Sequence, residues 1–304
     1  MGAVPPQPLS AALAAGPVVL DGGLSTELEA QGHDVSSALW SARLLRDDPA
    51  AVVAAHAAFA AAGAQVVTTA SYQASVEGFA TAFGLDRAGA LALIRRSVEL
   101  AREGAPEAWV AGSVGPYGAA LADGSEYTGA YVDEVGVRAL REFHRPRMAA
   151  LAEAGADVLA LETIPAAAEA EALLIEAEDL GVPVWLSLTT VRDAAGLARA
   201  RRGELAADVF AMAADVDVVL AVGVNCTAPA DVRAGVAAAA TSGRPVVVYP
   251  NSGEGWDATA RRWTGTGGVD PAAVPSWVAA GARLVGGCCR IGPSDIRRLA
   301  AALH

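Results

Sequence analysis

The chain has 304 residues, of which 53% are hydrophobic, and its net charge is -12. This length suits one large α/β domain or two small ones. The acidic balance argues against nucleic-acid or anionic-membrane partners, because both need clustered cations. All 22 basic residues are arginine, so the absence of lysine excludes Schiff-base chemistry and lysine-anchored pyridoxal phosphate.

The N-terminus has no basic start and carries prolines before its apolar part, unlike a signal peptide. We expect residues 1–16 to be a loose extension. No apolar stretch reaches the roughly 18 to 20 charge-free residues that span a bilayer. An odd, low count of three cysteines indicates a reducing compartment instead of a disulfide framework. We therefore expect a cytoplasmic protein.

Eight short apolar runs follow in chain order, each succeeded by a polar or glycine-rich turn and then by an alanine-rich amphipathic stretch. Their hydrophobicity is continuous, which is typical of strands that are buried on both faces of a parallel sheet. The runs cover residues 17–23, 64–72, 108–116, 156–165, 182–190, 218–226, 245–253 and 282–290.

The segments between the runs predict helices. Asp48 is a candidate N-cap for a helix that Gly63 would end. Segments 135–155 and 165–181 also end at glycine, and Ser294 is a candidate cap for the last helix. Eight such β–α units without a linker predict one (β/α)₈ barrel.

The barrel prediction covers residues 1–304 as a single domain. A doubly wound open sheet is the alternative. It has less support, because DGGLST after the first run is not the glycine-rich loop of dinucleotide-binding proteins.

The three cysteines stand at the ends of two predicted strands. Cys226 ends VVLAVGVNC, and Cys288 and Cys289 end ARLVGGCC. Three thiolates that converge from neighbouring strand ends would leave one position of a zinc-type ion open, as in a catalytic site. Adjacent cysteines point to opposite faces of an ideal strand, but Gly286 and Gly287 permit the chain to leave the sheet there.

Other interpretations of the cysteines stay open. The site could hold zinc without catalysing a reaction. Alternatively, it could be a thiol redox switch in which Cys226 pairs with Cys288 or Cys289. A lone buried cysteine is also often only a small hydrophobic residue.

Two carboxylates, Asp21 and Glu162, end the first and fourth predicted strands, on opposite sides of a barrel mouth. Paired-carboxylate hydrolysis is one interpretation, and capture of a substrate ammonium group is another. Asp21 could simply form a turn before two glycines. Glu162 would be partly desolvated, and a buried charge normally has a partner.

The motifs at these strand ends resemble those of the homocysteine S-methyltransferase family. In the family's order, they are DGGLSTELEAQG, TTASYQAS, GSVGPYGAALADGSEYTG, FHRPR with EAGADVLALETIP, VGVNCTAP, YPNSGE and GARLVGGCCRIGPSDI. The resemblance covers nearly the whole chain. It implies a zinc-bearing (β/α)₈ barrel that moves a methyl group onto the sulfur of homocysteine and forms methionine.

The resemblance also assigns roles to residues. Cys226, Cys288 and Cys289 correspond to the metal ligands. Asp21 and Glu162, with the backbone around Gly22, match positions that hold the amino-acid end of homocysteine. Asn225 adjoins a metal ligand and is a candidate for contact with substrate or for support of that ligand.

The methyl donor is less well defined. The chain ends soon after Cys289, so we expect no cobalamin or folate module and no C-terminal arm of the betaine-using branch. The lack of this arm favours a monomer. The motifs favour S-methylmethionine or S-adenosylmethionine, with betaine as the alternative. After the fifth strand, TTVRDAAGLARARRGE departs from the acidic loop of the family. Trp185, Tyr249 and Trp256 are candidates for contact with a sulfonium, although core packing is the more common role for the first two.

Overall fold

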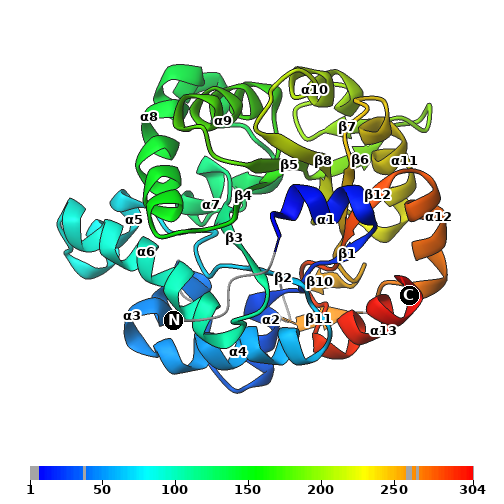
Figure 1. Ribbon diagram of the computed structural model, residues 1–304. Coiled ribbons are helices and arrows are strands. Elements are labelled where there is room, and N and C mark those ends of the chain that lie inside the picture. The colour runs from blue at the N-terminus through cyan, green and yellow to red at the C-terminus, as the bar shows by residue number, and fades with distance from the viewer. Residues whose placement is uncertain (1–6, 37–38, 258–261, 265–266, 304) are drawn as a thin grey trace.

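Eight parallel strands form a closed barrel, and helices surround it (Figure 1). The computed structural model describes residues 7–36, 39–257, 262–264 and 267–303. Around the barrel the strands lie in the order β1-β12-β9-β8-β5-β4-β3-β2. They are β1 (Val18–Val19), β2 (Val66–Thr68), β3 (Trp109–Val114), β4 (Val158–Ile164), β5 (Val184–Leu188), β8 (Val219–Asn225), β9 (Val246–Tyr249) and β12 (Ala282–Val285).

The ring closes between its first two strands. Gln65 donates its N–H to the Val19 carbonyl at 2.8 Å, and Asp21 donates to the Val66 carbonyl at 3.1 Å. Every predicted apolar run contains one strand of this ring. The (β/α)₈ prediction is therefore confirmed, and the open-sheet alternative is wrong.

The strands are buried on both faces because the barrel has an inner and an outer core. Trp185 and Val247 pack inside the barrel. Their neighbours Leu186 and Val248 point outward and pack under the helices. This alternation explains why the runs are continuously hydrophobic in the sequence.

The helices of the outer ring follow the predicted segments. They are α2 (Leu24–Ala30), α3 (Leu44–Asp47), α4 (Pro49–Ala61), α5 (Val76–Phe83), α6 (Arg87–Gly104), α7 (Tyr117–Leu121), α8 (Val132–Glu153), α9 (Ala167–Leu180), α10 (Ala206–Met212), α11 (Pro229–Ala240), α12 (Val274–Ala279) and α13 (Pro293–Leu303). Short 3₁₀ turns add η1 (Trp40–Arg43), η2 (Ser125–Tyr127) and η3 (Pro271–Ala273).

One predicted cap is confirmed and one is wrong. Asp48 accepts the Ala51 N–H at 3.2 Å at the start of α4. Ser294 lies inside α13, which begins one residue earlier. The carboxylate of Asp295 instead accepts the N–H of Gly292, the residue before the helix, at 3.0 Å, which is the reciprocal bond of a capping box.

The N-terminal segment is not loose where the structure describes it. Helix α1 (Leu9–Ala15) packs Leu9 and Leu13 against the barrel interior, and Trp109 donates to the Gln7 carbonyl at 3.0 Å. Without this helix the amino-terminal end of the barrel would expose apolar side chains. Burial of each leucine stabilises the fold by about 2 kcal/mol. Residues 1–6 lie outside the described part of the chain.

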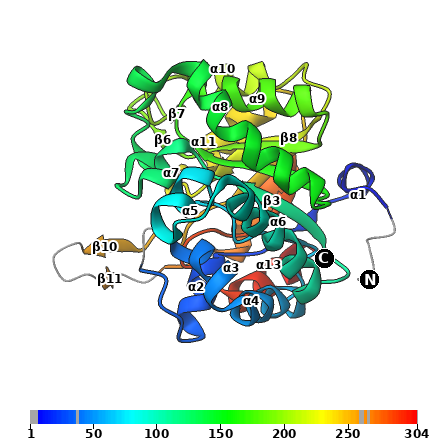
Figure 2. The ribbon, with the colours of Figure 1, turned by 90° about the vertical axis from the view of Figure 1, so that its left-hand side faces the viewer.

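Two antiparallel hairpins interrupt the β–α repeat at the other end of the barrel. Figure 2 shows them on the side opposite α1. One pairs β6 (Thr190–Arg192) with β7 (Ala198–Ala200), and the other pairs β10 (Gly255–Asp257) with β11 (Arg262–Thr264). No helix among the described residues has the length and hydrophobicity that a membrane span requires.

Candidate active site

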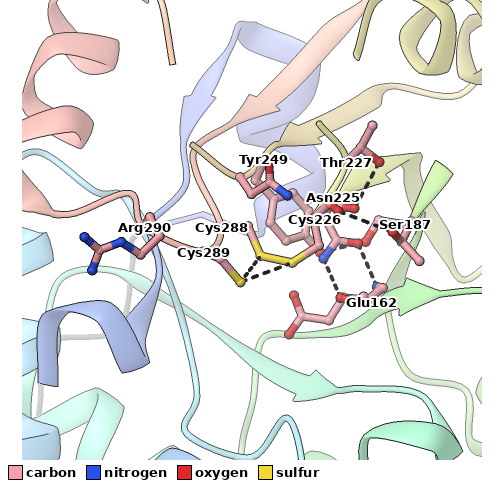
Figure 3. Close-up of a disulfide and its surroundings, with 12 residues drawn as sticks. Glu162, Ser187, Asn225, Cys226, Thr227, Tyr249, Cys288, Cys289 and Arg290 are labelled. Atoms are coloured by element: carbon pink, nitrogen blue, oxygen red, sulfur yellow. Dashed lines mark hydrogen bonds between the residues drawn. A yellow bond between two sulfur atoms is a disulfide. The ribbon is translucent and has the colours of Figure 1, made fainter. Parts of the chain in front are cut away.

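The three cysteines lie together at the carboxyl ends of β8 and β12 (Figure 3). A disulfide joins Cys226 to Cys288, which is one of the two pairings left open by the sequence. The sulfur of Cys289 lies 3.8 Å from that of Cys226 and 3.9 Å from that of Cys288. The convergence predicted from the strand ends is therefore confirmed.

Local backbone geometry brings the sulfurs together. Strand β12 ends at Val285, and a Cβ atom on Gly286 would lie 2.5 Å from the Asp21 carbonyl oxygen, so only glycine lets this strand end pass so close to β1. Cys226 has a left-handed backbone with φ 45°, which turns its side chain out of β8. As predicted, the chain leaves the sheet before Cys288.

The sulfurs fit a single soft metal ion once the disulfide is reduced. All three Sγ atoms lie within 4.8 Å of one another. Two thiolates on one tetrahedral zinc, each about 2.3 Å from the metal, are about 3.8 Å apart. The two separations that involve Cys289, 3.8 and 3.9 Å, match this spacing. A donor set of thiolates alone favours zinc or a similarly soft ion.

A cavity at the carboxyl end of the barrel contains six of the seven predicted site residues. These are the three cysteines together with Asp21, Gly22 and Glu162. Such a cavity is where barrel enzymes bind their substrates. Asn225 does not line it.

Asp21 is 2% exposed and is held by one neighbour. Thr68 donates its N–H to one carboxylate oxygen at 2.7 Å and its hydroxyl to the other at 2.8 Å. Burial, and to a smaller extent the nearby Glu162, raise the pKa of Asp21 to about 8, although the hydrogen bonds from Thr68 oppose this rise. A substrate cation would stabilise the ionised form, because no basic side chain among the described residues forms an ion pair with Asp21.

Glu162 is 7% exposed and faces the same cavity. Ser113 donates its hydroxyl to this carboxylate. Burial raises the pKa of Glu162, and hydrogen bonds from Ser113 and Tyr249 lower it. The expectation that this buried carboxylate has partners is confirmed, and the partners are hydroxyl groups.

Arg147 is a buried cation near Glu162 that was not predicted from the sequence as a site residue. It lies on α8 and donates to the carbonyls of Ser71, Tyr72 and Gly115 at 3.0, 2.7 and 3.0 Å. Its charge lowers the pKa of Glu162. An arginine at an apolar position of the predicted helix 135–155 was the available signal, since a buried guanidinium needs several acceptors.

Asn225 is fully buried and holds the end of β4. Its side-chain oxygen accepts the Thr163 N–H, and its amide donates to the Thr163 hydroxyl, both at 2.7 Å. Thr163 has φ 61°, a strained conformation for this residue type. The geometry therefore favours support of the Glu162–Thr163 corner over direct contact between Asn225 and substrate.

The aromatic side chains of the cavity agree only in part with those predicted. Trp185 lies in the barrel core and donates to the Tyr249 hydroxyl at 3.0 Å. Tyr249, one of the predicted candidates, lines the cavity, and so do Trp40, Tyr72 and Tyr127, which were not among the candidates. Tyr72 is the last residue of the second predicted apolar run, whereas Trp40 and Tyr127 lie in the short turns η1 and η2, which no hydrophobic periodicity marked. The side chain of Trp256 lies outside the described part of the structure.

Comparisons with known proteins agree with this geometry. The homocysteine S-methyltransferase family model matches residues 18–303. The homocysteine S-methyltransferase of Escherichia coli (strain K12) is 46% identical over 301 residues, which cover 93% of this chain and 94% of that protein.

Solved structures of the homocysteine methyltransferase MmuM from Escherichia coli are also similar. Its metallated form matches with a TM-score of 0.84 and 42% identity over 97% of this chain and 99% of that one. Its oxidized form matches with a TM-score of 0.82 and 43% identity over 94% and 95% of the two chains.

Proposed function

The chain belongs to the homocysteine S-methyltransferase family, and from this premise we propose that it transfers a methyl group from a sulfonium donor to the thiol of L-homocysteine. One observation carries the proposal. Three cysteine sulfurs within 4.8 Å of one another share a cavity with two buried carboxylates, Asp21 and Glu162. A substrate with a thiol at one end and an ammonium group at the other complements both.

Zinc is the metal that we propose for the three cysteines. Zn²⁺ prefers thiolate ligands, and three protein ligands leave its fourth position for substrate. When bound there, the ion would lower the pKa of the homocysteine thiol, so that the thiolate is available near neutral pH. Cys226 and Cys288 hold the ion only in their reduced form, because a disulfide sulfur is not a thiolate.

Asp21 and Glu162 would bind the ammonium group of homocysteine. Each carboxylate oxygen of Asp21 accepts one hydrogen bond from Thr68 and keeps acceptor capacity for a further donor. The contact would be strong, because both carboxylates are removed from water. Gly22 borders this end of the cavity, and a Cβ atom on it would clash with the Ile291 carbonyl oxygen, so only glycine lets the backbone pass here.

The donor would approach along the aromatic wall. Trp40 and Tyr72 stack with their ring centroids 6.4 Å apart, and Tyr127 lines the same cavity. The faces of aromatic rings attract a sulfonium cation. S-methylmethionine and S-adenosylmethionine both present such a cation with a transferable methyl group.

The reaction forms one carbon–sulfur bond and breaks another. The homocysteine sulfur bonds to the methyl carbon, and the bonding electron pair leaves with the donor sulfur as a neutral thioether. The thiol proton passes to solvent. Charge is neutralised as the thiolate meets the sulfonium, which a cavity shielded from water favours.

A methionine-formation assay tests this function. Reduced, zinc-loaded protein is supplied with homocysteine and either S-methylmethionine, S-adenosylmethionine or betaine. We expect methionine with a sulfonium donor and none with Cys226→Ser. No product from any donor would favour a non-catalytic metal-binding barrel, and full activity of Cys226→Ser would refute the role of the cysteines. A monomeric state and a cytoplasmic location stay predictions from the sequence.

A further inference from the structure

The segment that departs from the family motifs is structured and lies beside the site. After β5 it forms the β6–β7 hairpin, and residues 201–204 then return to the barrel. The Arg201 N–H donates to the Pro165 carbonyl at 2.9 Å. Glu204 accepts the Ala167 N–H at 3.0 Å at the start of α9, and Arg202 pairs with Asp133. The backbone around Arg201 is therefore anchored on both sides.

The guanidinium of Arg201 is not among the groups that line the cavity, but it lies next to residues at the cysteine end. Its Nη2 and Nε atoms donate to the Thr189 hydroxyl at 3.0 and 3.3 Å. Thr189 in turn donates to the Cys226 carbonyl at 3.3 Å. The guanidinium carbon also lies 5.9 Å from the centre of the Tyr127 ring. Arg201 is thus two hydrogen bonds from the main chain of a cysteine that lines the cavity.

Arg201 has no acidic contact among the described residues, although its neighbours do. Arg199 pairs with Asp193, and Arg202 pairs with Asp133. Asp231 attracts Arg201 only from beyond ion-pair distance, and its own contact is with Arg192. Arg201 is half-buried, and burial lowers its pKa. Most of its five N–H donors remain available to a ligand.

A free cation in this position is unfavourable for a sulfonium donor. Like charges about 5 Å apart repel by about 3 kcal/mol at the effective dielectric constant of a protein surface. A carboxylate on the donor reverses the sign of this interaction, and the planar guanidinium matches a carboxylate with two parallel hydrogen bonds. The cavity therefore suits a donor that carries its own negative charge.

We propose that Arg201 binds the carboxylate of the methyl donor and restricts the enzyme to donors that are amino acids. This inference rests on the proposed function, because it assigns a role to the donor end of the same site. It explains how a basic segment can border a cavity that takes a cationic substrate.

Donor analogues and matched variants test this role. S-methylmethionine is compared with its primary carboxamide, which keeps the sulfonium and the ammonium but lacks the carboxylate. The variants are Arg201→Gln, Arg201→Lys and, as a control on the same turn, Arg202→Gln. Hydrogen bonds to charged groups predict that the wild type has a KM for the carboxamide about 10- to 100-fold higher than for the acid.

In Arg201→Gln this preference should fall to near unity, with the KM for homocysteine unchanged. Arg201→Lys should keep part of the preference, and Arg202→Gln should keep all of it. A wild type that uses acid and carboxamide equally well, or an Arg201→Gln protein with the full preference, overturns the inference and leaves the proposed function intact.

Direct donor binding separates the two failures. Calorimetry measures binding of S-methylmethionine and of its carboxamide to reduced, zinc-loaded protein without homocysteine. Arg201-dependent preference for the acid supports the inference even if no methionine forms, an outcome that would refute only the proposed function. Equal binding of both compounds by the wild type contradicts the inference that Arg201 binds the donor carboxylate.

Discussion

Replacing Asp21 by asparagine should stabilise the substrate-free protein and weaken homocysteine binding. Asparagine has nearly the same shape, and it can still accept the Thr68 N–H and exchange a hydrogen bond with the Thr68 hydroxyl. It removes the ionisable group that burial disfavours. The same substitution deletes the negative charge that we assign to the substrate ammonium.

The size of the effect follows from the pKa of Asp21, which burial raises from 3.8 to about 8. In the unfolded chain the carboxyl ionises near pH 4, whereas in the folded protein it stays protonated up to about pH 8. Wild-type stability is therefore complete below about pH 4 and is lost as the pH rises toward 8, by about 1.4 kcal/mol per pH unit. At pH 7 the penalty is about 4 kcal/mol.

Urea unfolding across this pH range measures the penalty. The free energy of unfolding of Asp21→Asn minus that of the wild type, both reduced, should grow with pH and level off above about pH 8. Asp215→Asn removes an exposed charge and should give a difference of less than about 0.5 kcal/mol. The KM of Asp21→Asn for homocysteine should rise at least about tenfold.

Two results would refute this reasoning. A stability difference between Asp21→Asn and wild type that does not change with pH would mean that Asp21 is ionised in the folded protein. An unchanged KM for homocysteine would mean that the carboxylate does not face the substrate ammonium.

The disulfide and the Glu162 contact give further predictions. Oxidised protein should bind no zinc, and reduction of the Cys226–Cys288 bond should restore one equivalent of zinc per chain. Metal analysis and thiol titration measure this. Zinc binding at full stoichiometry by the oxidised form would contradict the assigned ligands. Cys289→Ser should bind zinc far more weakly but still form the disulfide, which mass spectrometry detects. Ser113→Ala removes a hydrogen bond to Glu162 and should raise the KM for homocysteine about tenfold with little change in kcat; an unchanged KM would place this carboxylate outside the substrate contact.

Much of the fold was predictable because the signals were local. Each barrel strand lies within a continuous apolar run, and Asp48 caps α4 as expected. Helix α1 was not predicted, because its segment, residues 9–15, is short and mostly alanine. The helix is ordered because it packs against the open end of the barrel, which forms only after strands far apart in the sequence have paired.

The site residues also divide into those that local signals in the sequence predicted and those that they did not. Cys226, Cys288, Cys289, Asp21 and Glu162 were found because they lie at or near the carboxyl ends of strands, and these ends meet at one edge of a parallel sheet. Trp40 and Tyr127 also line the cavity, but they lie in the short turns η1 and η2, whose positions depend on tertiary packing.

By itself, then, the sequence determined the barrel, the cysteine cluster and the two carboxylates, because strand periodicity and chain order are properties of neighbouring residues. Only the tertiary structure decided which groups touch. It turned Asn225 away from the cavity to hold Thr163, gave Asp21 its raised pKa through burial, and set Arg201 against Thr189 and Tyr127. These outcomes depend on contacts between residues far apart in the chain, and the free energy of burial and charge exists only once those contacts form.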